Sequence, residues 1–179
     1  MTNYSLKALL LVLALFLSSC GYETAKRGVK INDEVYSNIA IPTFHNVTYV
    51  LGVEGEVTQF LRKNVINSGE FDLTSREEAD IVLHGEVTSL GKAVLALNTV
   101  GSATEYRLSM SIKFNLKQNS SGKEIYEDTV SGTWDFKYMD NTIDNRITED
   151  EATTNLSNQL ARDILLLVKE RFSHNSRND

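Results

Sequence analysis

A strict alternation of apolar and polar residues in the middle of the chain constrains the fold more than any other feature. From Tyr106 to Leu116 every second residue is apolar, and the positions between them are polar or charged. A similar run extends from Tyr126 to Tyr138, after a turn signal at residues 119–122. Successive side chains of a strand point to opposite faces, so a period of two predicts paired strands with one apolar face and one face rich in serine and threonine.

Further strands are predicted on the N-terminal side of this pair. Residues 37–41 form a short strand, and residues 81–97 form a long one in which Gly85 and Gly91 are expected bends or bulges. A brief extended segment at residues 71–74 could add another short strand. We therefore expect a sheet of roughly four strands.

Two segments predict amphipathic helices that would cover the apolar face of the sheet. Residues 51–67 place apolar side chains at helical spacing, with acids early and bases late, and Gly69 is suited to a C-terminal cap. A second helix is expected to begin at Thr148, which forms a capping box with Glu151. Its apolar stripe comprises Ala152, Leu156, Leu160, Ile164, Val168 and Phe172. The predicted fold is an α+β two-layer sandwich, with two amphipathic helices on one face of a mixed sheet in the order β-α-β-β-β-α.

The beginning of the chain has the parts of a secretory signal. Lys7 is followed by an apolar run over residues 8–17 and by small residues before Cys20. The apolar run is too short to span a bilayer comfortably. Residues 17–20 look like a bacterial lipobox, in which the thiol takes a diacylglycerol, residues 1–19 are removed, and the new amine takes an acyl chain such as palmitate. The alternative is an unpaired thiol behind an ordinary cleavage site.

Lipid on Cys20 would tether the protein to a membrane without spanning it, because several acyl chains on one residue hold far more firmly than one. Gly21 takes the place where inner-membrane retention signals usually have aspartate, which favours the outer membrane. Residues 20–34 then form the lipidated N-terminus and tether, residues 35–172 a single domain, and residues 173–179 a flexible polar tail. The net charge of −6 argues against nucleic acid as a partner.

The sequence offers little for catalysis or metal binding. His45 in a predicted loop, His84 in a strand and His174 in the tail lack any metal-ligand spacing, and no glycine-rich phosphate loop or nucleophile elbow occurs. His84 and Glu86 are the one acid and base pair within a strand. We therefore predict a protein that is not an enzyme and holds neither a metal nor a dissociable cofactor, with covalent lipid on Cys20 as its modification.

Three aromatic residues, Trp134, Phe136 and Tyr138, fall on the apolar side of the alternation. They could form a platform for a ligand. Core packing is the better interpretation, because aromatic side chains bury a large area.

Several short motifs follow one another in a characteristic order. They are Cys20-Gly21-Tyr22, residues 39–48, the glycine and glutamate of Gly52-Val53-Glu54, residues 79–87, residues 103–107, Gly122-Lys123 and Ala152. Their order and spacing across residues 20–172 resemble the LptE family of lipopolysaccharide-assembly lipoproteins. The fold of that family, two helices on a mixed sheet, matches the fold read from the residues.

The resemblance implies an outer-membrane lipoprotein of the lipopolysaccharide transport and assembly machinery, lying on the periplasmic face. Its partner would be LptD, an outer-membrane β-barrel that inserts lipopolysaccharide, with this protein as plug and assembly partner and a possible lipopolysaccharide-binding subunit. A hydroxyl-rich sheet face suits the polar lumen of such a barrel. The alternative is another periplasmic-facing outer-membrane lipoprotein, such as an activator of a cell-wall synthase.

Four basic residues are the candidate contacts to lipopolysaccharide phosphate. Some relatives carry a base in the turn that corresponds to residues 98–102, and this chain has none there. Arg146, expected in a loop just before the capping box, is the first candidate, and Lys92 is the second. Arg107 and Lys113 project from the predicted polar face of the sheet, where isolated bases are usually only solvated.

Overall fold

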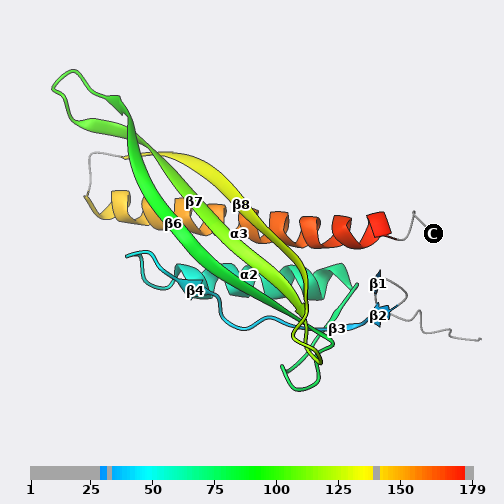
Figure 1. Ribbon diagram of the computed structural model, residues 1–179. Coiled ribbons are helices and arrows are strands. Elements are labelled where there is room, and N and C mark those ends of the chain that lie inside the picture. The colour runs from blue at the N-terminus through cyan, green and yellow to red at the C-terminus, as the bar shows by residue number, and fades with distance from the viewer. Residues whose placement is uncertain (1–28, 32–33, 139–141, 176–179) are drawn as a thin grey trace, which may run out of the picture.

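The structure, a computed structural model, describes residues 29–31, 34–138 and 142–175, and side chains within residues 34–138 and 145–171 (Figure 1). One layer is a sheet and the other is a pair of helices, which confirms the predicted α+β sandwich. The signal at residues 1–19, Cys20 and the side chain of Phe172 lie outside the described residues.

A six-stranded mixed sheet forms one layer, so the sheet has more strands than expected. Strands β6, β7 and β8 are antiparallel neighbours, and β3 runs parallel between β5 and β6, with β4 also pairing parallel to β6. The bounds are β3 Asn38–Ala40, β4 His45–Asn46, β5 Asp72–Leu73, β6 Ile81–Leu97, β7 Ala103–Gln118 and β8 Glu124–Lys137. The short strand expected near residue 71 is therefore present as β5.

Two more strands, β1 Val29–Ile31 and β2 Glu34–Tyr36, pair antiparallel in a separate two-stranded sheet. No strand was expected in this segment, which overlaps the end of the predicted tether at residues 20–34.

The alternation in β7 and β8 has the predicted consequence. Leu108, Met110, Ile112, Phe114 and Leu116 are buried on the helix-facing side, and Val130 and Phe136 of β8 lie on the same side. The opposite side, which we call the polar face, carries the odd-numbered residues of β7 from 105 to 117 and of β8 from 127 to 137. The hairpin turns expected at residues 98–102 and 119–122 separate β6, β7 and β8 as predicted.

The expectation that Gly85 and Gly91 make bulges is wrong. Both pair regularly with β7, and the register shifts fall at Val87/Ser89 and from Val94 to Leu97. Gly85 has a packing role instead, because a Cβ atom built there would lie 2.2 Å from the buried ring of Phe44.

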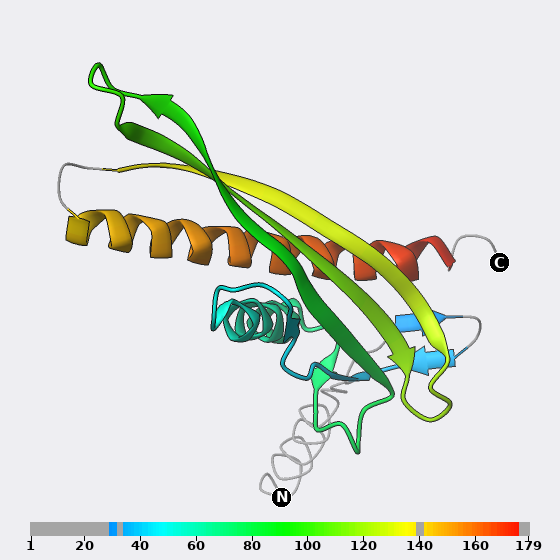
Figure 2. The ribbon, with the colours of Figure 1, turned by 60° about the vertical axis from the view of Figure 1, so that its left-hand side comes forward.

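Helix α2, Val53–Ser68, and helix α3, Thr142–Asn175, form the second layer and cover the apolar side of the sheet (Figure 2). The predicted stripe of α3 is buried from Ala152 to Val168. Gly69 caps α2 in the left-handed conformation at φ 66°, as expected, and its N–H donates to the carbonyl of Ile66. A Cβ on Gly132 of β8 would lie 3.1 Å from Leu156 and Leu160, so this glycine lets α3 pack closely against the sheet.

The predicted capping box at Thr148 and Glu151 is also wrong. Helix α3 already begins at Thr142, so Thr148 lies inside the helix. A capping residue needs non-helical backbone followed by free amides, and the preceding helical turn takes that role away from Thr148.

Candidate functional site

The polar face of the sheet is organised as a ladder of cross-strand pairs between β7 and β8. Arg107 makes a bidentate ion pair with Asp135, directly opposite, with both nitrogen–oxygen distances at 2.7 Å. Ser111 and Ser131 share a hydrogen bond of 2.8 Å between their hydroxyl oxygens. The local order of these residues follows from the period of two, which places each polar side chain beside its cross-strand neighbour.

Both candidate bases on the polar face are thus neutralised by an acid. Lys113 lies 3.0 Å from Glu127, and the Arg107 hydrogen bonds hold the pKa of Asp135 below its usual range. The sequence predicted isolated, solvated bases at these two positions. In the structure each base is paired with an acid instead. The face therefore offers hydrogen-bonding groups without a strong local net charge.

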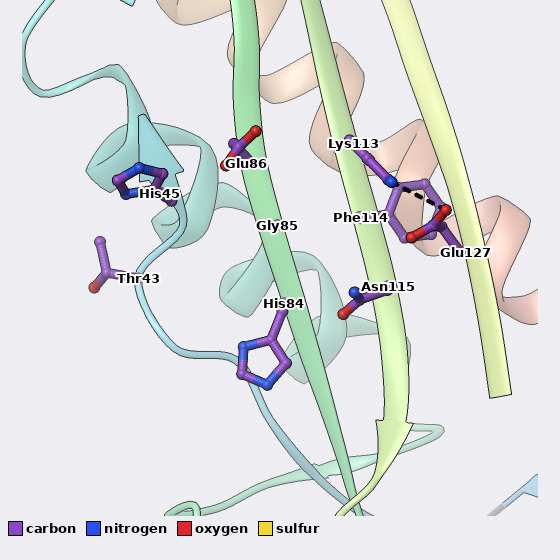
Figure 3. Close-up of a pocket in the computed structure, with 9 residues that line it drawn as sticks. All are labelled: Thr43, His45, His84, Gly85, Glu86, Lys113, Phe114, Asn115 and Glu127. Atoms are coloured by element: carbon purple, nitrogen blue, oxygen red, sulfur yellow. Dashed lines mark ion pairs between the residues drawn. The ribbon is translucent and has the colours of Figure 1, made fainter. Parts of the chain in front are cut away.

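A depression of about 400 Å³ lies at the β4 side of this face (Figure 3). His45, on β4 and not in the loop expected for it, is the register partner of Glu86 on β6. His84 of β6 and Asn115 of β7 line the same depression. Burial, and then the positive charges of Arg76 and Lys117, lower the pKa of His84 and so favour its neutral imidazole. The carboxamide oxygen of Asn115 is buried without a hydrogen-bond partner in the described structure.

No group of three or more His, Cys, Asp or Glu side chains among the described residues is placed to hold a metal ion. The depression is lined by groups of both charges. Its lining offers donors and acceptors of hydrogen bonds, among them Glu86 and Asn115.

Lys92 lies on the helix-facing side of the sheet, opposite Leu108, in a compact polar cluster. Its ammonium nitrogen is 2.6 Å from a carboxylate oxygen of Glu149 and 3.0 Å from the hydroxyl of Tyr138, which itself donates to Glu149. The same nitrogen lies 5.4 Å from the ring centre of Tyr106. Burial alone would lower the pKa of Lys92, but the hydrogen bonds to Glu149 and Tyr138 outweigh it and raise that pKa.

The carboxyl of Glu149 shows the reciprocal effect. Burial favours its neutral form, yet the hydrogen bonds from Lys92 and Tyr138 lower its pKa below 4.5. Sequence reasoning missed Glu149 and Tyr138 as partners of Lys92. No local signal could have found them, because Lys92 and Glu149 are 57 positions apart in the chain.

Arg146 lies in helix α3 and not in the loop expected for it. It is exposed and lines a depression of about 310 Å³ together with Val50, Leu90 and Lys92. No ion pair of Arg146 occurs within the described residues. The structure thus brings Arg146 and Lys92 to one depression, while Arg107 and Lys113 lie on the polar face.

The three aromatic residues of β8 do not share one environment. Phe136 is 6% exposed and Tyr138 packs against the core, as expected. Trp134 keeps 37% of its surface exposed although it is on the helix-facing side, because β8 is the last strand of the sheet. The core role predicted for Trp134 is therefore only partly correct.

The helices of the described chain include none that is long and apolar enough to cross a membrane. The described residues define the class of domain, a small α+β sandwich whose sheet has one polar face. Comparison with known proteins then identifies the family.

The sequence model of the LptE family, described as lipopolysaccharide-assembly, matches residues 36–167. The match extends over more than half of the chain, so the protein belongs to the LptE family. This is a family of assembly lipoproteins and not of enzymes. No curated protein sequence matches the chain.

Solved structures with the same fold support this assignment at the level of architecture. Rare lipoprotein B from Shewanella oneidensis is 16% identical, with 75% of this chain and 95% of that chain covered and a TM-score of 0.55. A hypothetical protein from Chlamydia trachomatis is 11% identical, with coverages of 76% and 98% and a TM-score of 0.56. Lipoprotein B from Nitrosomonas europaea is 15% identical, with coverages of 84% and 96% and a TM-score of 0.50.

Proposed function

We propose that this protein is an outer-membrane lipoprotein, anchored on the periplasmic face through lipid on Cys20, that serves as plug and assembly partner of an LptD-like β-barrel. The observation that carries the proposal is the family match over residues 36–167. The lipobox-like residues 17–20 support the anchor.

The polar face is the surface proposed to meet the barrel. The lumen of a large membrane barrel is polar and hydrated, so a partner surface there needs hydrogen-bonding groups more than apolar area. Ser111 and Ser131 supply hydroxyls at the centre of the face, and the Arg107–Asp135 and Lys113–Glu127 pairs leave little unbalanced charge. Binding through such a surface should depend only weakly on salt.

The test is affinity purification of the acylated protein in detergent, with the exposed Ser131 replaced by tryptophan. Ser131→Trp places a bulky apolar group on the polar face and should abolish recovery of the β-barrel. Gln59→Trp, at an exposed position of α2, is the matched control and should retain it. Thermal unfolding of both variants checks that they fold.

Recovery of a penicillin-binding protein in place of a barrel would support the alternative, an activator of a cell-wall synthase. Equal recovery of the barrel with both tryptophan variants would refute the polar face as the contact. A mature protein without lipid on Cys20 would refute the anchor.

We also propose that lipopolysaccharide phosphate contacts Arg146, with Lys92 beside it. Arg146 is the better candidate, because the charge of Lys92 is already balanced by Glu149. Arg146→Ala should weaken binding of purified lipopolysaccharide, whereas Arg107→Ala on the polar face should leave it unchanged. Equal binding by both variants would contradict this assignment.

A further inference from the structure

The edge of β6 that faces away from β7 is covered along only part of its length. β3 and β4 pair with this edge no further than Val87. No strand of the described chain pairs with it beyond that residue, although β7 pairs with the other edge as far as Leu97 (Figure 1). We call residues 89–94 on this side the open edge. Its backbone groups offer hydrogen bonds to an added strand.

The chain itself turns away from β6 where the open edge begins. Val47 donates its N–H to the carbonyl of Val87 at 3.2 Å. The side chain of Asn46 then accepts from the N–H of Thr48 at 2.8 Å and donates to the carbonyl of Val50 at 2.7 Å. These hydrogen bonds direct the chain into α2. The position beyond β4 is therefore not filled by the described part of this chain.

A hydrogen bond between β6 and β7 shows which backbone groups face the open edge. The carbonyl of Ser111 on β7 points to β6, because it accepts from the hydroxyl of Thr88 at 3.1 Å. Successive residues of a strand direct their backbone groups to opposite edges, so every second residue of β7 also faces β6. The β6 partners of those residues, Gly91 and Ala93, in turn face β7. The amides that face the open edge are those of Leu90, Lys92 and Val94.

The usual devices that protect a sheet edge do not occur at residues 89–94. Natural edges are commonly blocked by proline, bulges or charged side chains. The open edge has no proline and pairs regularly with β7, and the register shifts of β6 fall on either side of it. Its one charged side chain, Lys92, is held by Glu149 on the helix-facing side. The open edge spans about 20 Å at roughly 3.4 Å per residue, which is enough for one short added strand.

A depression lies beside the open edge on the helix-facing side of the sheet. It is the depression of about 310 Å³ that Arg146 and Lys92 line. Its apolar lining comprises Val50, Leu90 and Leu108. Alternate side chains of an added strand would point to this side. Proteins that bind extended peptides combine pairing at a sheet edge with a pocket for such side chains, and the open edge meets both requirements.

The size of the open edge decides between two possible occupants. Pairing along so short an edge buries far less than the roughly 800 Å² that each partner of a stable complex contributes, so a second copy of this chain would not be held there. A segment of a protein that is already bound through the polar face needs no separate association. The strands of a closed barrel are all paired with one another, so the barrel can offer only a loop.

We propose that an extended loop segment of the barrel partner pairs with the open edge of β6 and places an apolar side chain against Val50, Leu90 and Leu108. This inference rests on the proposed function and adds main-chain pairing to the contacts of the polar face. Strand addition would also bring the barrel next to the proposed phosphate contact at Arg146.

The test measures hydrogen exchange of single amides in the acylated protein, both alone in detergent and in the complex recovered by the affinity purification above. The amides of Leu90, Lys92 and Val94 should exchange at least about tenfold more slowly in the complex, because a paired amide exchanges only when the pair opens. The amides of Gly91 and Ala93 face β7 and should be slow in both samples. Unchanged exchange at the three outward amides, with the barrel present, would overturn this inference and leave the proposed function intact. Absence of the barrel from the purified sample would overturn both.

Lys92→Pro separates strand pairing from mere covering by the barrel. Proline at this position removes an outward N–H and leaves the ladder to β7 intact. Lys92→Ala is the matched control, because both variants lose the contact with Glu149 and only the proline variant loses the amide. In the complexes, the K92A protein should keep slow exchange at Leu90 and Val94, and the K92P protein should lose it.

Equally slow exchange in the two variants would overturn the inference, because it would indicate covering without pairing. Thermal unfolding of both variants checks that the proline is accommodated. The comparison of the unmodified protein with and without the barrel decides the question by itself if the K92P protein does not fold.

Discussion

The role of Gly85 leads to the most direct test of the packing described above. Gly85→Ala would add a Cβ atom 2.2 Å from Cε2 of Phe44, where ordinary contacts lie beyond 3.4 Å. Phe44 is only 3% exposed and is held between strand and helix, so its ring has little room to move. Overpacking of this kind costs about 1–3 kcal/mol. We expect the upper part of that range, because the overlap exceeds an ångström and involves the ring itself.

Gly91→Ala is the matched control in the same strand. It also pairs regularly with β7, but nothing lies within 4 Å of the Cβ position. Alanine there should be neutral or stabilise by about 0.4–1 kcal/mol, because it reduces the freedom of the unfolded chain. The assay is urea unfolding followed by circular dichroism, which gives the free energy of unfolding. In thermal unfolding, a cost of about 2 kcal/mol would appear as a loss of roughly 4–8 °C in Tm.

A double variant separates the clash from other effects of alanine. Phe44→Leu alone destabilises through lost packing, but in combination with Gly85→Ala the smaller side chain should relieve the overlap. The two changes should therefore cost less together than the sum of their separate costs. The reasoning is refuted if Gly85→Ala and Gly91→Ala have the same stability, or if the costs are additive.

Three further predictions concern the helices and the polar cluster. Ile164→Ala should lower the free energy of unfolding by about 2–5 kcal/mol, because the side chain is fully buried. Leu166 is 54% exposed, so Leu166→Ala should change that free energy by less than about 0.5 kcal/mol. Similar values for the two variants in urea unfolding would contradict the assigned helix face. Glu56→Ala should lower the free energy of unfolding by about 1–3 kcal/mol, because it leaves the buried hydroxyl of Ser157 without its acceptor. An unchanged free energy of unfolding would exclude this hydrogen bond between the two helices. The folded pKa of Glu149 is lowered from 4.5, so its contribution is present above that value and is lost as the pH falls through the folded pKa. Stability measured from pH 7 to pH 3 should therefore fall less steeply for Glu149→Gln than for the unchanged protein, and parallel curves would rule out the effect.

Periodicity predicted most of the architecture because it reports directly on burial. The alternation in β7 and β8 and the apolar stripe of α3 each define one face, and an element with one apolar face must pack against another. The turns and the C-terminal cap of α2 were predictable for a similar reason, since a few adjacent residues determine their backbone.

Signals that are local but weak were misleading. Thr148 and Glu151 match a capping box, yet the helix begins earlier at Thr142, so the pattern lies within an existing helix. Gly85 was expected to bend its strand, and its purpose is visible only when Phe44, distant in sequence, is placed against it. A glycine in a sequence does not reveal whether its backbone or its missing side chain matters.

For the candidate bases, too, the sequence predicted one property and missed another. The alternation predicted that Arg107 and Lys113 are exposed on the polar face of the sheet. The acids that neutralise these two bases depend on strand register, and the acid that neutralises Lys92 depends on where α3 crosses the sheet. Pairing of Lys92 with Glu149 joins a strand to a helix across 57 positions.

Sequence by itself determined the class of fold, the face that each long element buries, and the family to which the motifs point. Those properties depend on the spacing of apolar residues and on the order of the motifs, and both can be read directly from the sequence. Tertiary structure decided which bases remain unpaired, why Gly85 must be glycine, and that one edge of β6 is left open at residues 89–94. Each of these depends on distances between segments far apart in sequence, and only folding sets those distances.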